Sequence, residues 1–328
     1  MKKLFNENIA SVIKNNPAAK FLVSLSGGVD SMVALHLLKN FSDTVTPIEF
    51  SAIHVNHNID KEDDDWQSFC QNVCKRIDVN LIIENVFLRG LAAIDGEARI
   101  KRYKVIAKHT DSNTYVITGH HANDSAESLL MALQHGTGLD GLCGIRDIRP
   151  MQYSDGLVFR PLLPFTKNDI IEYAINQHIS WVEDPSNSKP IYLRNKIRIT
   201  VLPQLVKGGG EGVIHRINNT AKICQNTLKA MNELIEMNLK NNSEWNKDHP
   251  WCLPVSALAS ETLAPFVIRH WMKLNGMVLL PSSALINNMV KQVYIDFKPH
   301  NKPVIMISGG IEIKRIGTKL HFSRNKTK

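Results

Sequence analysis

The chain has 328 residues, of which 43% are hydrophobic, so it is long enough for one large domain and a second, smaller one. Lys and Arg outnumber Asp and Glu by 39 to 31, and the net charge of +8 suits a polyanionic partner, although a basic surface also serves solubility. No run reaches the roughly 20 apolar residues of a membrane span, and the N-terminus lacks a signal-peptide core, so we expect a cytoplasmic protein with no membrane partner.

The first predicted element is a helix near the N-terminus, where Leu4, Ile9, Val12 and Ile13 recur at the spacing of one helix face. A buried strand follows from Phe21 onward, and it leads into the sequence SGGVDS.

The SGGVDS sequence predicts a glycine turn that opens a second helix. Adjacent glycines allow a tight turn and a close approach to a ligand, and the unpaired N–H groups of a helix N-terminus attract anions. Ser26 and Ser31 add hydroxyl groups for phosphate oxygens, and Asp30 adds a carboxylate for Mg²⁺ or for positioning a group. A strand–turn–helix joint without a ligand is the alternative. The sequence is neither a Walker loop nor a GxGxxG fingerprint.

Strands and helices then alternate, which predicts an α/β fold with a doubly wound parallel sheet. The expected strands cover 48–56, 81–86 and 115–118, and a helix begins within 60–65. On that helix Cys70 and Cys74 lie on the apolar face, so they are expected to pack in the core; five cysteines without a CxxC pair fit a reducing compartment. Ligands of such sheets bind at the carboxyl ends of the strands, and polar segments follow three of the strands, at 26–31, 54–57 and 119–127.

The segment 119–127, GHHANDSAE, is the second candidate site. Asp124 and Glu127 would share one helix face, where two carboxylates could recognise an amine, take up its proton or hold a metal. A capped helix start with no ligand is the alternative. The adjacent residues His120 and His121 cannot point the same way, which argues against a two-histidine metal site.

Two further segments have two interpretations each. Arg99, Arg102 and Tyr103 would share a helix face that is either solvated or in contact with a ligand. The glycine-rich sequence HGTGLDGLCG, at 135–144, is either a loop that closes over a site or a linker.

A basic band precedes the expected domain boundary. From Arg194 to Lys229 there are seven Lys or Arg residues and one acid, Glu211, which suits contact with a phosphate backbone. Gly208 to Gly212 form the expected linker. We therefore predict a catalytic domain over 1–212, and over 213–328 a helical linker with a smaller α+β domain, its helices near 213–240, 261–274 and 282–294 and its strands near 303–307, 310–316 and 319–323.

Several motifs occur together in one order along about the first 230 residues: SGGVDS (26–31), HVNH (54–57), EARxxRY (97–103), GHH with DxxE (119–127), GLCG (141–144), RPLL (160–163), EDPSN (183–187) and RNxxR (194–198). In these motifs the chain resembles the tRNA(Ile)-lysidine synthetases, which belong to the N-type ATP pyrophosphatases and carry a PP-loop. The remainder resembles more weakly the first of two tRNA-contacting domains of longer members.

The resemblance implies ATP-dependent ligation of L-lysine to C2 of the wobble cytidine, position 34, of the CAU-anticodon tRNA(Ile). An adenylated cytidine would be the intermediate, and AMP and diphosphate would be released. The implied cofactors are ATP and Mg²⁺, the partners are the tRNA and L-lysine, and a homodimer stays open.

The resemblance also assigns roles to individual residues. The implied catalytic residues are Asp30, Asp124, Glu127 and Arg99. The implied ATP-binding residues are Ser26, Gly27, Gly28, Val29, Asp30, Ser31, His54, Asn56 and Gly119. The implied tRNA contacts are Arg194, Asn195, Arg198 and Arg102, and the implied metal ligand is Asp30.

Three positions depart from the family pattern. Asn123 replaces a usual Asp, which bears on metal binding at that position; Ser125 replaces a common Gln, and Asp60 replaces a common basic residue.

Three rival functions remain open. A PP-loop tRNA thiolation enzyme would need reactive or cluster-binding cysteines, and only Cys143 lies in a suitable loop. A small-molecule amidating ATP pyrophosphatase, such as an NAD or GMP synthetase, would turn over without tRNA. A non-catalytic RNA-binding module would release no pyrophosphate, and Asn123 is its only support in the sequence.

Overall fold

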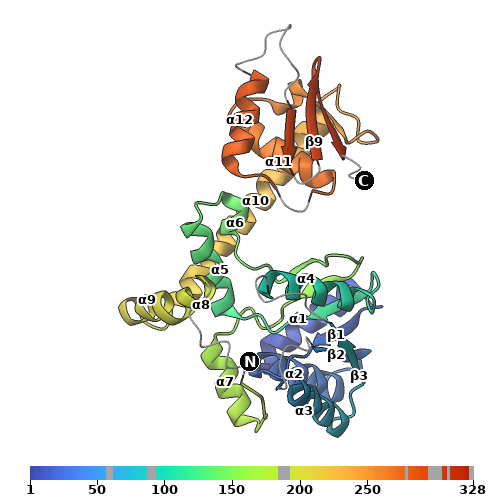
Figure 1. Cartoon of the computed structure of the whole chain (residues 1–328), viewed down its shortest axis with the longest axis vertical. Helices are drawn as coiled ribbons and strands as arrows, with labels where there is room; N and C mark the ends of the chain where they lie inside the picture. The colour runs from blue at the N-terminus through green and yellow to red at the C-terminus, as the bar shows by residue number, and fades with distance from the viewer. Residues whose placement is uncertain are drawn as a thin grey trace. The chain divides into compact units, whose positions relative to one another are not determined.

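The computed structural model describes residues 1–56, 62–86, 94–183, 193–277, 280–294, 305–308 and 311–324. The chain forms two compact units, one of residues 1–131 and 144–220, the other of residues 132–143 and 221–328. In Figure 1 the labels β1 to β3 and α1 to α4 mark the first unit, and β9, α11 and α12 mark the second.

The first unit is built on a six-stranded sheet with the strand order β3-β2-β1-β4-β6-β5. Five neighbouring strands run parallel, and β5 pairs antiparallel to β6 at the edge. The bounds are β1 (Lys20–Ser24), β2 (Phe50–Asn56), β3 (Leu81–Asn85), β4 (Thr114–Ile117), β5 (Ile148–Pro150) and β6 (Leu157–Phe159). The predicted α/β fold with a parallel, doubly wound sheet is confirmed.

Helices cover both faces of this sheet because alternate residues of a strand point to opposite sides. From β1, Phe21 and Val23 join the core formed with α1, α2, α3 and α7, whereas Leu22 joins the core under α4. The helices of this unit are α1 (Lys2–Asn15), α2 (Val29–Thr44), α3 (Glu62–Arg76), α4 (Ile94–Ala107), α5 (Ala122–Gln134), α7 (Lys167–Asn176), α8 (Leu193–Lys196), a π-helical turn (Ile197–Val201) and α9 (Leu202–Gly209). Helices α5 and α10 (Val213–Asn241) each contribute residues to both units. Among the helices described, none has both the length and the apolar character needed to cross a bilayer.

The N-terminal helix forms as expected, and its buried face departs from the predicted one only at Leu4. Phe5, Ile9 and Val12 are buried, while Leu4 is 40% exposed. The spacing of four and three residues places these three side chains on one side of α1, and Leu4 falls beside that stripe.

The two cysteines of α3 pack in the core, as predicted. Cys70 and Cys74 are free and buried, and burial raises the pKa of the Cys70 thiol to about 12. Such thiols stay protonated and act as small apolar side chains.

The second unit contains a four-stranded antiparallel sheet with the order β7-β10-β9-β8. Its elements are α6 (Leu139–Leu142), β7 (Cys252–Pro254), a 3-10 turn (Val255–Leu258), α11 (Ala264–Leu274), α12 (Ser283–Tyr294), β8 (Ile305–Ser308), β9 (Ile311–Ile316) and β10 (Lys319–Arg324). Trp271 of α11 is fully buried in its core against Phe322.

Residues 135–143 of the glycine-rich segment belong to this second unit, and they carry α6. Its Asp140 forms ion pairs with Arg269 and Lys273 of α11. The segment is therefore anchored to α11 of the second unit, and the loop and linker interpretations stay predictions.

Gly119 sets the distance between the end of β4 and the start of α2. A Cβ atom at this position would lie 2.8 Å from the Cβ of Asp30 and 3.1 Å from the backbone nitrogen of Ser31. Only glycine allows this approach, because no real Cβ atom packs at such distances.

We expect Gly119→Ala to destabilise the protein by about 1–3 kcal/mol, because the added methyl group must push the backbone of α2 away. Urea unfolding of the full chain measures this. Gly208→Ala is the matched control, since a Cβ there meets no atom within 4 Å and the residue lies in α9. Equal stability of the two variants would contradict the role given to Gly119.

Candidate functional site

The turn between β1 and α2 is held by its own serines. Gly27 has φ +84°, and its carbonyl accepts a hydrogen bond from the N–H of Val182 at 3.0 Å. The Ser31 hydroxyl donates to the carbonyl of Gly28 at 2.9 Å and accepts from the N–H of Ser26 at 3.2 Å. Ser31 is buried, and its only O–H proton is donated to the Gly28 carbonyl within the loop, whereas Ser26 is exposed. Ser26 is therefore the hydroxyl better suited to face a ligand.

The other predicted ATP-binding residues contact the protein around this turn. His54 is buried, and its Nδ1 lies 2.9 Å from the carbonyl of Leu25, so it ties β2 to the start of the loop. Asn56 donates to Asp64 and Gln67 of α3 at 3.3 Å and 3.1 Å. Val29 is the first, buried residue of α2. These side chains shape the end of the sheet, and their contact with ATP stays a prediction.

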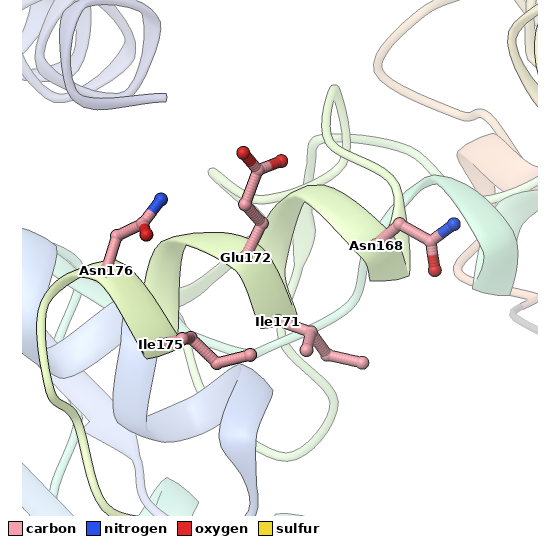
Figure 2. Close-up of a pocket in the computed structure, with 5 residues that line it drawn as sticks. All are labelled: Asn168, Ile171, Glu172, Ile175 and Asn176. Atoms are coloured by element: carbon pink, nitrogen blue, oxygen red, sulfur yellow. The ribbon is translucent and has the colours of Figure 1, made fainter.

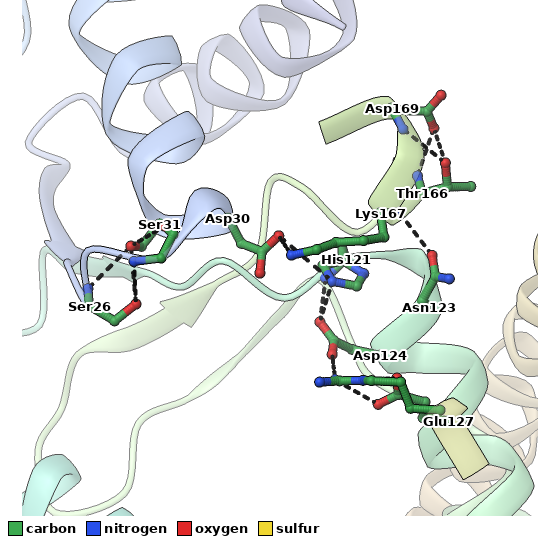
Figure 3. A network of polar contacts seen from close by, with 12 residues as sticks. Ser26, Asp30, Ser31, His121, Asn123, Asp124, Glu127, Thr166, Lys167 and Asp169 are labelled. Atoms are coloured by element: carbon green, nitrogen blue, oxygen red, sulfur yellow. Dashed lines mark hydrogen bonds and ion pairs between the residues drawn. The ribbon is translucent and has the colours of Figure 1, made fainter. Parts of the chain in front are cut away.

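Asp30 faces a lysine that the sequence did not single out. Lys167, the first residue of α7, places its Nζ 2.7 Å from Oδ1 of Asp30, and Nε2 of His121 lies 3.8 Å from the same oxygen (Figure 3). Thr166 and Asp169 form a capping box that starts α7 at this point. That box, readable as T-x-x-D, could have located the helix start, but nothing in the sequence pairs its lysine with Asp30.

The acidic pair of α5 is bound by two arginines. Arg194 donates to Asp124 and to Glu127, both at 2.8 Å. Arg198 donates to Glu127 at 2.7 Å and to Asp124 at 3.2 Å. Sequence reasoning assigned the acids to lysine and the arginines to tRNA; the structure brings the two pairs into one cluster.

The acids of this cluster are buried, and the arginines are partly open to solvent. The Glu127 side chain is 1% exposed and that of Asp124 9%, against 33% for Arg194 and 36% for Arg198. Burial alone would raise the pKa of Asp124, but the charges of His121 and Arg194 outweigh it and hold that pKa below its usual value. Asp124 is thus held in its ionised form, and the two carboxyl groups are matched by two guanidinium groups.

Helix α5 starts one residue earlier than Asn123, and its capping uses Asp124. The N–H of His121 donates to Oδ2 of Asp124 at 2.9 Å. Asn123 accepts instead from the N–H of Lys167 at 2.9 Å, so its amide oxygen joins α5 to the start of α7 (Figure 3). An amide oxygen fills this structural role as a carboxylate would.

Three further predicted residues lie on α4 and α8. Arg99 of α4 is exposed, and its guanidinium lies 5.4 Å from the ring centre of Tyr103. Arg102 lies on the same helix, and Asn195 lies on α8 between the two arginines in sequence. His57, Asp60 and residues 184–187 of the EDPSN motif lie outside the described residues.

A shallow hollow of about 330 Å³ lies over α7 (Figure 2). Its lining is Asn168, Ile171, Glu172, Ile175 and Asn176, all from that one helix. None of the predicted site residues borders it.

The protein oxygen atoms around the turn fit magnesium only if a nucleotide supplies further ligands. Asp30 offers carboxylate oxygens and is 30% exposed, but no set of three His, Cys, Asp or Glu side chains gathers for a metal among the residues described. Mg²⁺ commonly takes one or two carboxylates and completes its shell with phosphate oxygens and water, so Asp30 suits an ion that arrives with a nucleotide.

Comparison with known proteins agrees with the fold. Residues 1–205 match the PP-loop domain family. A tRNA(Ile)-lysidine synthase of Wigglesworthia glossinidia brevipalpis is 32% identical over 92% of this chain and 76% of its own length. The Histophilus somni (strain 2336) protein of the same name is 31% identical over 84% of this chain and 63% of its own. The chain thus spans less than two thirds of the length of several relatives.

Among solved structures, the U34-tRNA thiolase NcsA from Methanococcus maripaludis with its [4Fe-4S] cluster is similar with a TM-score of 0.54. The match covers 68% of this chain and 77% of that one at 18% identity. This likeness concerns the fold alone.

We expect Glu127→Gln to destabilise the protein by about 2–3 kcal/mol, because two arginines lose the carboxylate they share. The value lies below that of fully buried pairs, since both arginines reach solvent. Thermal and urea unfolding measure the effect. Glu172→Gln on the exposed face of α7 is the control and should stay within about 0.5 kcal/mol of the wild type. If Glu127→Gln unfolds like Glu172→Gln, the cluster does not stabilise the fold.

Proposed function

Since the chain belongs to the PP-loop domain family and to the tRNA(Ile)-lysidine synthase family, we propose that it uses ATP to attach L-lysine to C2 of cytidine 34 in the CAU-anticodon tRNA(Ile). The observation that carries the proposal is the position of two buried, arginine-paired carboxyl groups beside the PP-loop turn. Asp30, His121 and Asp124 form a continuous path, with 3.8 Å and 3.5 Å between successive side chains.

In the first step the turn binds ATP, and O2 of cytidine 34 attacks the α-phosphorus while the bond to pyrophosphate breaks. Backbone N–H groups at the start of α2 and the Ser26 hydroxyl face the phosphates. Lys167 supports this step, because its ammonium can move from Asp30 to a phosphate oxygen as negative charge builds there. Mg²⁺ held by Asp30 and the phosphates would neutralise part of the same charge.

In the second step the ε-amine of lysine attacks C2, the C2–O bond breaks and AMP leaves. The incoming ammonium must first bind as a cation and then lose a proton. Asp124 and Glu127 can do both, since the pKa of Asp124 is lowered and Glu127 is paired with two guanidinium groups. The carboxylates are held by Arg194 and Arg198 when no substrate is bound.

The carboxylates can bind lysine and the arginines can bind tRNA if the ion pairs between them open and each side takes a substrate group as its new partner. Arg194 and Arg198 are a third exposed, so an RNA phosphate can reach them. When they turn toward that phosphate, Asp124 and Glu127 are left with excess negative charge in a buried position. An ammonium group from lysine then restores the balance, which couples lysine binding to tRNA binding.

The remaining parts of the proposal concern the assembly. We propose that residues 1–212 form the catalytic domain, that residues 213–328 contact the tRNA, and that the protein acts in the cytoplasm. A homodimer can be tested by the elution volume of the full chain with and without tRNA.

The thiolation alternative finds less support in the cysteines. Cys143 is buried and its Sγ donates to the carbonyl of Leu139, and Cys70 and Cys74 have raised pKa values. The raised pKa values leave little thiolate on Cys70 and Cys74, so both are poor nucleophiles.

Partner exchange predicts that lysine binds roughly tenfold more tightly in the presence of CAU tRNA than in its absence, with a non-hydrolysable ATP analogue present in both cases. Isothermal titration of the full chain measures both dissociation constants. By linkage, lysine must tighten tRNA binding by the same factor, which gives an internal check. Equal lysine affinity with and without tRNA would exclude the exchange.

For the reaction itself, incubation with CAU tRNA, ATP and lysine should convert cytidine 34 to lysidine with release of AMP, as detected by mass analysis of the nucleoside. Asp30→Asn and Asp124→Asn should lower the rate by about 10²-fold or more, because each removes a charge that contacts a reacting group. Glu172→Gln should keep full activity. Modification of cytidine 34 without added lysine would refute the proposed reaction. Lysidine formation at the wild-type rate in both Asp variants would refute the roles given to Asp30 and Asp124.

A further inference from the structure

Three arginines converge on one buried tyrosine at the edge of the first unit. The guanidinium carbons of Arg99 and Arg149 each lie 5.4 Å from the ring centre of Tyr103. Arg160, directly after β6, is only 4% exposed, and the charges of Arg149 and Tyr103 act on its pKa. Tyr103 itself is 4% exposed. Arg99 and Arg149 thus share one aromatic partner, and the charge of Arg149 also acts on Arg160.

This cluster holds positive charge without a carboxylate to balance it. Among the residues described, none of Arg99, Arg149 and Arg160 forms an ion pair with an acid. Arg160 donates one hydrogen bond to the carbonyl of Arg146 at 2.7 Å, while its buried Nε has no hydrogen-bond partner. Burial and the charge of Arg149 lower the pKa of Arg160 to about 10. An unbalanced, buried guanidinium is costly, so its retention indicates a ligand.

The same excess of positive charge reaches the candidate site. His120 follows β4 at the carboxyl edge of the sheet, and Arg160 follows β6 at that edge. Burial lowers the pKa of His120 to about 3; Asp124 opposes this, and the charges of Arg160, Arg194 and Arg99 add to it. The cluster therefore adjoins the carboxyl ends where ligands of such sheets bind.

We propose that Arg99, Arg149 and Arg160 form a phosphate-binding site, and that the phosphate comes from the backbone of the RNA substrate. The choice of RNA rests on the proposed function. Guanidinium groups bind phosphate oxygens through paired N–H donors, and the free Nε of Arg160 supplies one such donor. The phosphates of ATP already have a cradle at the PP-loop turn, which leaves this second site for the polynucleotide.

The test uses Arg149→Ala in the full chain, because Arg149 is only partly buried and can be removed without opening the core. We expect it to weaken binding of CAU tRNA roughly tenfold and to lower the salt dependence of binding by about one phosphate contact. ATP affinity, measured separately by titration, should stay within twofold. Arg76→Ala is the matched control; Arg76 is exposed at the end of α3, next to the amino end of β3, and should leave tRNA binding unchanged.

The possible outcomes distinguish three questions: whether the phosphate site exists, which ligand it binds, and whether the proposed reaction occurs. Weaker ATP binding with unchanged tRNA binding would keep the phosphate site but assign it to the nucleotide. Unchanged binding of both would overturn the proposal. If the wild type makes no lysidine yet Arg149→Ala still weakens tRNA binding and Arg76→Ala does not, the proposed reaction fails while the phosphate site stands. Circular dichroism of each variant checks that the fold is retained.

Discussion

The ion pairs between α5 and the segment 194–198 are the interaction on which the site depends. They join residues some seventy positions apart in sequence and place two carboxylates in a buried position at the end of the sheet. A buried carboxylate without a partner would take up a proton or expose itself to water. The arginines give both side chains a charged partner, and Asp124 lies 3.5 Å from His121, which lies 3.8 Å from Asp30 at the start of α2.

The acids and the arginines of the cluster differ in their exposure to solvent. The acids are shielded, and the arginines reach solvent, so an approaching polyanion meets the arginines first. The π-helical turn that carries Arg198 belongs to a class of local distortion often found at functional sites. Burial of one partner and access to the other is the arrangement expected of a contact that a substrate opens.

The sequence predicts the framework far better than the partners within it. Strand and helix periodicity located the parallel sheet, and the spacing of Asp124 and Glu127 placed them on one helix face. The link to Arg194 and Arg198 depends on how two distant segments pack, which no local pattern encodes. The same holds for Lys167, whose partner Asp30 lies on another helix. The resemblance implies that Gly119 contacts ATP, which stays a prediction, and its packing against Asp30 follows only from the approach of two backbones.

Two charge clusters, one with balanced charges and one with excess positive charge, therefore lie at the carboxyl edge of one sheet. In the cluster around Glu127 the charges cancel, which makes a resting state that is stable without substrate. Around Tyr103 three arginines have no acid to balance them among the described residues, so the field there stays positive. An RNA phosphate attracted by the unbalanced cluster would arrive next to the balanced one and compete for its arginines. Attraction at the first cluster and exchange at the second then become successive parts of a single binding event.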